Sequence, residues 1–266
     1  LNREAAALIA TNRLDAIELK GHQREYPHNE YYRALNCGYR LPLVGGTDKM
    51  SSDVAVGYWR TYVKLSEDEE FTYDNWCRNV VKGRTFLTSG PIIGMTVEGY
   101  EIGDMVSLSG PGTVEVNVWA DSIHPMHRLD IIKAGRVVAS TSSKAGSRRL
   151  QLKEKIKIDG HTWLAARCGS ASYFGDPDYD TLHRGIYAHT SPTYVECGGD
   201  WDMFNPHTAK HMLNVVDGDL AYIRETAVHY PDGLVTHHHG EKDHLGYLQR
   251  PFKEAREALR KRLQDH

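Results

Sequence analysis

A short turn early in the chain combines residue types that often hold a ligand. Residues 41–48 read LPLVGGTD, an apolar run followed by two glycines, a threonine and Asp48. In α/β folds, ligands and metals bind at the carboxyl ends of strands, so a carboxylate in this position commonly faces one. An aspartate in a turn rich in glycine and threonine can also serve only to cap that turn. The pattern alone leaves both interpretations of Asp48 open.

Two clusters of histidines could also bind a metal, and the first is a helical pair. His207 and His211 stand four residues apart, which places both imidazoles on one helical face at a spacing that can hold zinc. The glutamate of the H-E-x-x-H motif is absent, so the general base of a zinc protease is missing. The alternative is a pair of solvated histidines on an exposed helix.

The second cluster is the segment THHHGEKDH at residues 236–244. Alternate side chains of an extended segment point to opposite faces, so at most two of its three consecutive histidines can reach one ion. We therefore weigh a metal site that includes His238 and His239 against an exposed polar loop.

Other histidines lie beside apolar, strand-like segments. His22 and His28 follow the strand-like segment LDAIEL, in the loop where the site of an α/β fold would lie, so they are either substrate-side residues or ordinary loop histidines. His189, in the segment AHTSP, could face a site or only form a hydrogen bond at the end of a strand.

A run of aspartates has the spacing of a calcium loop. Asp176, Asp178 and Asp180 alternate, but Thr181 and Tyr187 stand where an EF-hand needs glycine and a bidentate glutamate. This pattern indicates a surface turn.

Composition narrows the class of protein. Hydrophobic content of 40% and charged content of 25% are typical of a globular soluble protein, and a net charge of -3 supplies no basic field for nucleic acid. The longest early apolar run, AAALIA, is too short to cross a membrane.

Four cysteines without C-x-x-C spacing favour a reduced, cytoplasmic setting. No G-x-S-x-G elbow, P-loop or G-x-G-x-x-G fingerprint occurs.

The elements that would position these residues fall into three parts. Before residue 91, three strand-like segments alternate with helical ones, which predicts about three parallel β/α units, too few to close a barrel. Residues 91–197 contain short alternating strands separated by turn residues, which predicts an antiparallel Ig-like β-sandwich. Residues 198–266 are predicted to be helical, with a helix around 207–229, the histidine-rich loop and a terminal helix interrupted at Pro251.

Several segments together resemble a known family. The most specific are GYRLPLVGGTD and GRTFLTSGP, accompanied by LDAIEL and IYAHTSPTYV. They resemble the C-terminal part of the CehA/McbA-type metallohydrolases of the PHP (polymerase and histidinol phosphatase) superfamily, in pattern over most of residues 1–196. The resemblance implies a distorted (β/α) barrel, with its C-terminal portion at residues 1–90, followed by an appended β-sandwich. It also matches Asp48 to a metal ligand, whereas Met50 stands where many members have a histidine.

The resemblance implies metal-dependent hydrolysis of an ester, carbamate, amide or phosphoester bond in a small-molecule substrate, with zinc, manganese or iron as the metal. The family's His-x-His ligands do not precede the segment LDAIEL, which begins at Leu14. We therefore expect this chain to be the C-terminal part of an enzyme, inactive alone, that forms a homo-oligomer or associates with an N-terminal half. The alternative is a noncatalytic binding or interaction module built on the β-sandwich.

Overall fold

The computed structural model describes residues 4–19, 25–52, 54–173, 175, 179–180, 184–226 and 242–266. The chain divides into two compact units. The larger unit comprises Asp15–Met203, and the smaller one comprises Leu1–Leu14 together with Phe204–His266.

The larger unit is built on a mostly antiparallel sheet of 10 strands. The main path through the sheet runs β3-β4-β11-β10-β8-β5-β6, while β9 pairs with β8, and β12 pairs with both β10 and β7. The strands are β3 (Arg60–Val63), β4 (Thr85–Thr88), β5 (Ile92–Val97), β6 (Tyr100–Glu101), β7 (Met105–Leu108), β8 (Gly112–Lys133), β9 (Arg136–Ile158), β10 (Thr162–Gly169), β11 (Tyr187–Thr190) and β12 (Thr193–Cys197).

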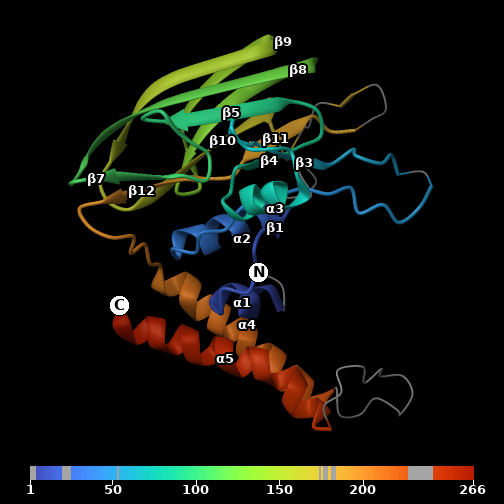
Figure 1. Ribbon diagram of the computed structural model, residues 1–266, viewed down its shortest axis with the longest axis vertical. Coiled ribbons are helices and arrows are strands. Elements are labelled where there is room, and N and C mark those ends of the chain that lie inside the picture. Colours follow the sequence, from blue (N-terminus) through green and yellow to red (C-terminus); the bar gives the residue numbers. More distant parts are fainter. Residues whose placement is uncertain are drawn as a thin grey trace. The chain divides into compact units, whose positions relative to one another are not determined.

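The long strand β8 joins two halves of this sheet (Figure 1). Its first half pairs with β5, its second half pairs with β10, and β9 accompanies both halves. Alternate residues of the first half are buried, which is the pattern of a strand with one face on a core. The two halves share a core that includes Ile93, Met95, Val97, Val114, Val116, Val118, Leu129, Ile131, Leu164, Ala166, Cys168, Ala188 and Val195.

The sheet confirms the antiparallel prediction for most of residues 91–197, but the prediction was wrong for one pair. Strands β7 and β12 run parallel, with Val106 opposite Val195. The sheet also spans residue 90, where a domain boundary was expected, because β4 pairs with β11.

Strand β3 does not form the third parallel β/α unit that was expected. It pairs antiparallel with β4. Tyr62 of β3 stacks on Phe86 of β4 with ring centroids 5.1 Å apart, and such cross-strand aromatic pairs stabilise an antiparallel ladder.

One parallel β-α-β unit is present in the described part of the chain. Strand β1 (Ile17–Glu18) pairs in parallel with β2 (Leu43–Val44), and helix α2 (Glu25–Asn36) lies between them in sequence. Hydrogen bonds join β2 to the larger sheet: the Leu43 N–H donates to Ser191 Oγ, and Thr85 Oγ1 donates to the Leu43 carbonyl. The parallel pair is therefore fixed against β4 and the segment after β11.

Helix α3 (Tyr73–Val81) begins after a threonine cap. The Thr72 side chain accepts a hydrogen bond from the Asn75 N–H, and Gly83 just beyond the helix has a φ of 78°. The buried residue of this helix is the polar Asn79, whereas an amphipathic helix usually buries its apolar residues.

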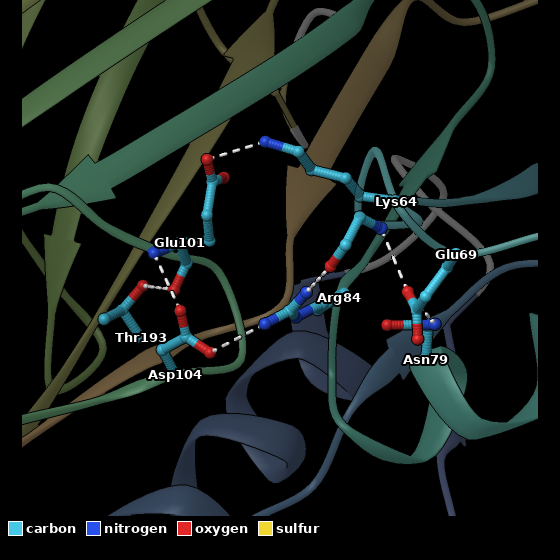
Figure 2. A network of polar contacts seen from close by, with 8 residues as sticks. Lys64, Glu69, Asn79, Arg84, Glu101, Asp104 and Thr193 are labelled. Carbon is cyan, nitrogen blue, oxygen red and sulfur yellow. Dashed lines mark hydrogen bonds and ion pairs between the residues drawn. The ribbon is translucent and has the colours of Figure 1, made fainter. Parts of the chain in front are cut away.

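A polar network explains the burial of Asn79 (Figure 2). Asn79 Nδ2 donates to Glu69 Oε2, which also accepts from the Ser66 N–H. Arg84 donates to Ser66 Oγ and forms an ion pair with Asp104. The labelled residues that join α3 to the strands around it in this way are Lys64, Glu69, Asn79, Arg84, Glu101, Asp104 and Thr193.

The smaller unit contains α1 (Glu4–Ala10), α4 (Pro206–Glu225) and α5 (His244–Asp265). Helix α5 continues through Pro251, so the prediction of an interruption at this proline was wrong. A proline inside a helix costs one backbone hydrogen bond. Phe252, Ala255 and Leu259 nevertheless form one buried face beyond it, and this packing accounts for the continued helix. None of the helices in the described ranges has the length and apolar character needed to span a bilayer.

Candidate functional site

Asp48 lies in the turn after β2, at the end of the parallel pair where β1 also ends. Because the carboxyl ends of parallel strands meet at one edge, Glu18 and the Asp48 turn share that edge. A Cβ added to Gly46 would lie 3.0 Å from Glu18 Oε1, so the turn passes directly beside this carboxylate. Asp48 is exposed and has a φ of 49°, a left-handed conformation in which aspartate is enriched. Sites of function often hold residues in such conformations.

Hydrogen bonds to the larger sheet fix the position of this turn. The Thr61 hydroxyl accepts from the Gly45 N–H at 2.9 Å and donates to the Gly45 carbonyl at 2.8 Å. Thr47 Oγ1 donates to the Trp59 carbonyl at 2.9 Å. A Cβ at Gly45 would lie 2.9 Å from the Cβ of Leu87, so glycine is required there. The turn therefore presents Asp48 from a rigid support.

The donor set at this edge suits a hard divalent cation in part. Carboxylate oxygens bind manganese and zinc, but a catalytic site generally needs about three protein ligands. Within the described ranges, no group of three His, Cys, Asp or Glu side chains is arranged to hold a metal. The Asp48 turn can therefore supply only part of a ligand set.

His28, expected on a loop beside the substrate, lies instead in α2 and is only 1% exposed. Its Nε2 lies 3.0 Å from the hydroxyl of Tyr187 on β11. The two rings meet edge to face, with centroids 5.5 Å apart. His22, the other expected substrate-side residue, lies outside the described residues.

His189 is fully buried in β11, close to His28. Its Nδ1 lies 2.7 Å from the Thr190 carbonyl, which can only accept, so Nδ1 carries the proton. Nε2 then accepts from the Tyr32 hydroxyl at 2.6 Å. Burial, reinforced by the neighbouring His28, lowers the pKa of His189 well below its usual value. Burial also raises the pKa of Tyr32, so the imidazole is neutral and the phenol keeps its proton. We refer to His28, Tyr32, Tyr187 and His189 as the buried histidine cluster.

A buried carboxylate lies near this cluster, where Arg167 interacts with both Tyr32 and Asp130. Asp130 of β8 has no exposed surface and accepts hydrogen bonds from Arg128 Nε, Arg167 Nε and Ser140 Oγ at 2.7, 3.2 and 2.7 Å. The Arg167 guanidinium also lies over the ring of Tyr173, 4.5 Å from its centroid. These contacts join β8, β9 and β10.

The arrangement around the buried histidine cluster is structural in character. Its polar groups bond to one another across α2 and β11 and have little access to solvent. Sequence reasoning singled out His28 and His189 but missed Tyr32, Tyr187 and Asp130. The available signal for Asp130 was its position as the one charged residue inside the otherwise apolar segment LDII.

The remaining candidates are separated. His207 is exposed and His211 half-buried, both on α4, and neither belongs to a three-ligand group among the described residues. His237, His238, His239 and Glu241 lie outside the described residues. Asp243, at the end of that loop, caps α5 by accepting from the Gly246 N–H at 2.8 Å.

The aspartate run is described only at its end. Asp180 accepts from the Arg184 N–H and forms an ion pair with its guanidinium at 2.6 Å. Asp176 and Asp178 lie outside the described residues. None of the four cysteines forms a disulfide.

Comparisons with known proteins do not assign this chain to a family. No family model matches it, and no curated protein matches it. Among solved structures, the fibronectin(III)-like modules of Clostridium thermocellum CbhA match 40% of this chain and 93% of their own, at 14% identity. The TM-score is 0.20, and a likeness at that level carries no argument about fold or function.

Proposed function

We propose that this chain is part of a metal-dependent hydrolase of the CehA/McbA type within the PHP superfamily, and that Asp48 is one of its metal ligands. The observation that carries the proposal is the turn after β2. Two tightly packed glycines and a left-handed aspartate place an exposed carboxylate at the carboxyl edge of a parallel strand pair. The segments that resemble the family surround this turn and include β4 and β11.

In this proposal, the β1-α2-β2 unit is the C-terminal portion of a (β/α) barrel, and the antiparallel sheet is the appended Ig-like β-sandwich. Asp48 contributes one carboxylate, and the ligand set is completed by residues beyond those described. Thr47 and Thr61 orient Asp48 by anchoring the turn to β3 and the residue before it. The metal, when bound, would lower the pKa of a coordinated water and polarise the oxygen of the bond to be cleaved. The substrate class is a small ester, carbamate, amide or phosphoester.

Activity assays test this proposal. The chain alone and a longer chain that adds a barrel half with a His-x-His strand ahead of residue 1 would be assayed with p-nitrophenyl acetate and p-nitrophenyl phosphate. We expect manganese- or zinc-dependent turnover in the longer chain and little or none in the chain alone. Full metal-dependent turnover by the chain alone would place the active site elsewhere.

A second candidate function is a noncatalytic binding module built on the antiparallel sheet. An open cavity of about 590 Å³ beside β8 and β9 favours this function. Ligand binding there that is unaffected by changes at Asp48, in a longer chain without hydrolytic activity, would support the binding module over the hydrolase.

A further inference from the structure

A break in the pairing of β8 and β9 opens the cavity of about 590 Å³ beside these two strands. Asp121 pairs with Arg149 and Met126 pairs with Ser147, so residues 122–125 of β8 lie opposite Arg148 alone. Such bulges turn side chains away from the regular ladder and are frequent beside binding sites. The cavity at this bulge is lined by Ile92, Asp121, Ser122, Ile123, Arg148 and Arg149.

The shape of the bulge is fixed by local contacts. The His124 N–H donates to Ser122 Oγ at 3.0 Å, and His127 Nδ1 lies 3.0 Å from the Ser143 carbonyl. Gly146 has a φ of 76°, and a Cβ there would lie 2.7 Å from Pro125, so the partner strand approaches closely only because this residue is glycine. The cavity is therefore preformed, which lowers the entropic cost of binding.

The charge of the cavity is positive. Arg149 Nε donates to Asp121 Oδ1 at 2.6 Å, and this ion pair neutralises one of the two arginines. The Arg148 side chain is exposed and forms no hydrogen bond or ion pair with any residue in the part of the chain that the structure describes. Because a guanidinium can donate two parallel hydrogen bonds to a carboxylate, Arg148 is suited to an anionic group. Ser122 Oγ accepts from a backbone N–H, so its own proton remains available to the same group.

Apolar surface borders the charged end. Ile123 is 77% exposed, and Ile92 lies opposite Asp121 on the neighbouring strand. The next pair with the same orientation is Gly94 and Trp119, and the indole lies so close over Gly94 that an added Cβ would be 2.6 Å from it. Trp119 remains 42% exposed. A flat apolar surface thus continues from the cavity along the outer face of the sheet.

We propose that this cavity binds a small organic anion, with its carboxylate held by Arg148, Arg149 and Ser122 and its apolar body against Ile92 and Ile123. A neutral sugar or alcohol would leave the Arg148 charge without a partner, so the charge favours an anion. The small number of contacts predicts a dissociation constant on the order of 0.1–1 mM. The site is remote in sequence from Asp48 and does not depend on the hydrolase proposal.

The probe for this site is 1-naphthoate, titrated into the chain by calorimetry and by ¹H–¹⁵N correlation spectra. We expect saturable 1:1 binding, a dissociation constant raised about tenfold or more by Arg148→Gln, and similarly weak binding of the uncharged 1-naphthamide. Arg136→Gln is the matched control, because it removes one exposed positive charge from the same strand outside the cavity. Asp48→Asn is expected to leave binding unchanged.

Three results would overturn the proposal. These are the absence of saturable binding, an equal loss of affinity in Arg136→Gln, and equal affinity for 1-naphthamide. The second would mean that strand charge alone attracts the anion, and the third that the surface is merely apolar.

Discussion

Asp130 shows how one buried residue can stabilise several strands. Removing its carboxylate leaves Arg167, whose side chain is 14% exposed, without its buried ionic partner. Losing one member of a buried ion pair typically costs about 3–5 kcal/mol. We expect Asp130→Ala to lower the free energy of unfolding in urea by an amount of this order.

The control for that measurement is Asp159→Asn. Asp159 pairs with Lys157 on the surface, where both side chains are more than half exposed and solvent screens the interaction. The urea midpoint of this variant should match that of the parent. Equal losses in the two variants would contradict a special role for Asp130.

The buried histidine cluster should make stability depend on pH. The folded-state pKa of His189 lies well below the unfolded-state value of about 6.5, because burial and His28 disfavour the charged imidazole. Below about pH 6.5 the unfolded chain therefore binds a proton that the folded chain does not, and stability falls as the pH falls. The slope from this one group approaches about 1.4 kcal/mol per pH unit.

Urea unfolding between pH 7 and pH 5 measures this effect. His189→Gln keeps a donor for Thr190 and an acceptor for Tyr32 but cannot take up the proton. The variant should lose less stability than the parent over this range. Parallel curves would show that His189 does not titrate as its environment indicates.

Part of this residue-scale picture could be predicted from the sequence. The Gly-Gly-Thr-Asp turn could be predicted from its residue types. His28 and His189 could be singled out as candidate residues from the strand-like segments beside them. The partners Tyr32 and Tyr187 could not be predicted, because each hydrogen bond joins residues more than 150 positions apart. Spacing along the chain carries no information about such contacts.

At the scale of elements, the β8–β9 hairpin turn offers a direct test. Ala134 and Gly135 have φ values of 48° and 85°, so both central residues adopt the left-handed conformation of a type I′ turn. Asparagine tolerates this conformation better than alanine. Ala134→Asn should therefore stabilise the protein by about 0.5–1 kcal/mol in urea unfolding. Ala134→Val should destabilise it, because a β-branched residue is strained at positive φ. The reverse order would contradict the turn geometry.

Local signals predicted the elements well, whereas pairing direction was harder. The Thr72 cap, the Gly135 turn and the alternation in β8 all depend on residue types that lie close together in the sequence. The parallel direction of β7 depends on β12, a strand distant in sequence, and the antiparallel direction of β3 depends on how the chain returns through α3 to β4. The helix through Pro251 likewise depends on a buried face that continues beyond the proline.

At the scale of the whole molecule, helix α3 and the residue before its cap, Phe71, present apolar side chains to solvent. Phe71 and Tyr73 are 83% and 79% exposed, Val81 is 55% exposed, and Trp76 is 37% exposed. Because Asn79 takes the inward position, the apolar side of this helix faces outward. Exposed apolar patches of this kind mark protein interfaces. We expect a second copy of the chain to cover this face.

Sedimentation velocity tests that expectation. The double variant Phe71→Glu, Trp76→Glu should shift the chain from dimer toward monomer at micromolar concentrations. Val138→Glu places one negative charge on β9, which among the described strands pairs with β8 alone and so forms an open edge there. If Val138→Glu alone dissociates the dimer, the sheet edge mediates association and α3 does not.

The central claim, that Asp48 is a metal ligand, is tested most directly by calorimetric titration of manganese into the longer chain that carries the His-x-His barrel half. Three proteins are compared: the parent, Asp48→Asn, and Asp68→Asn, which changes an exposed carboxylate away from the turn. The account predicts that Asp48→Asn weakens manganese binding by about 100-fold or more, since it removes a charged ligand, and that Asp68→Asn binds as the parent does. Unchanged manganese affinity in Asp48→Asn would contradict the account.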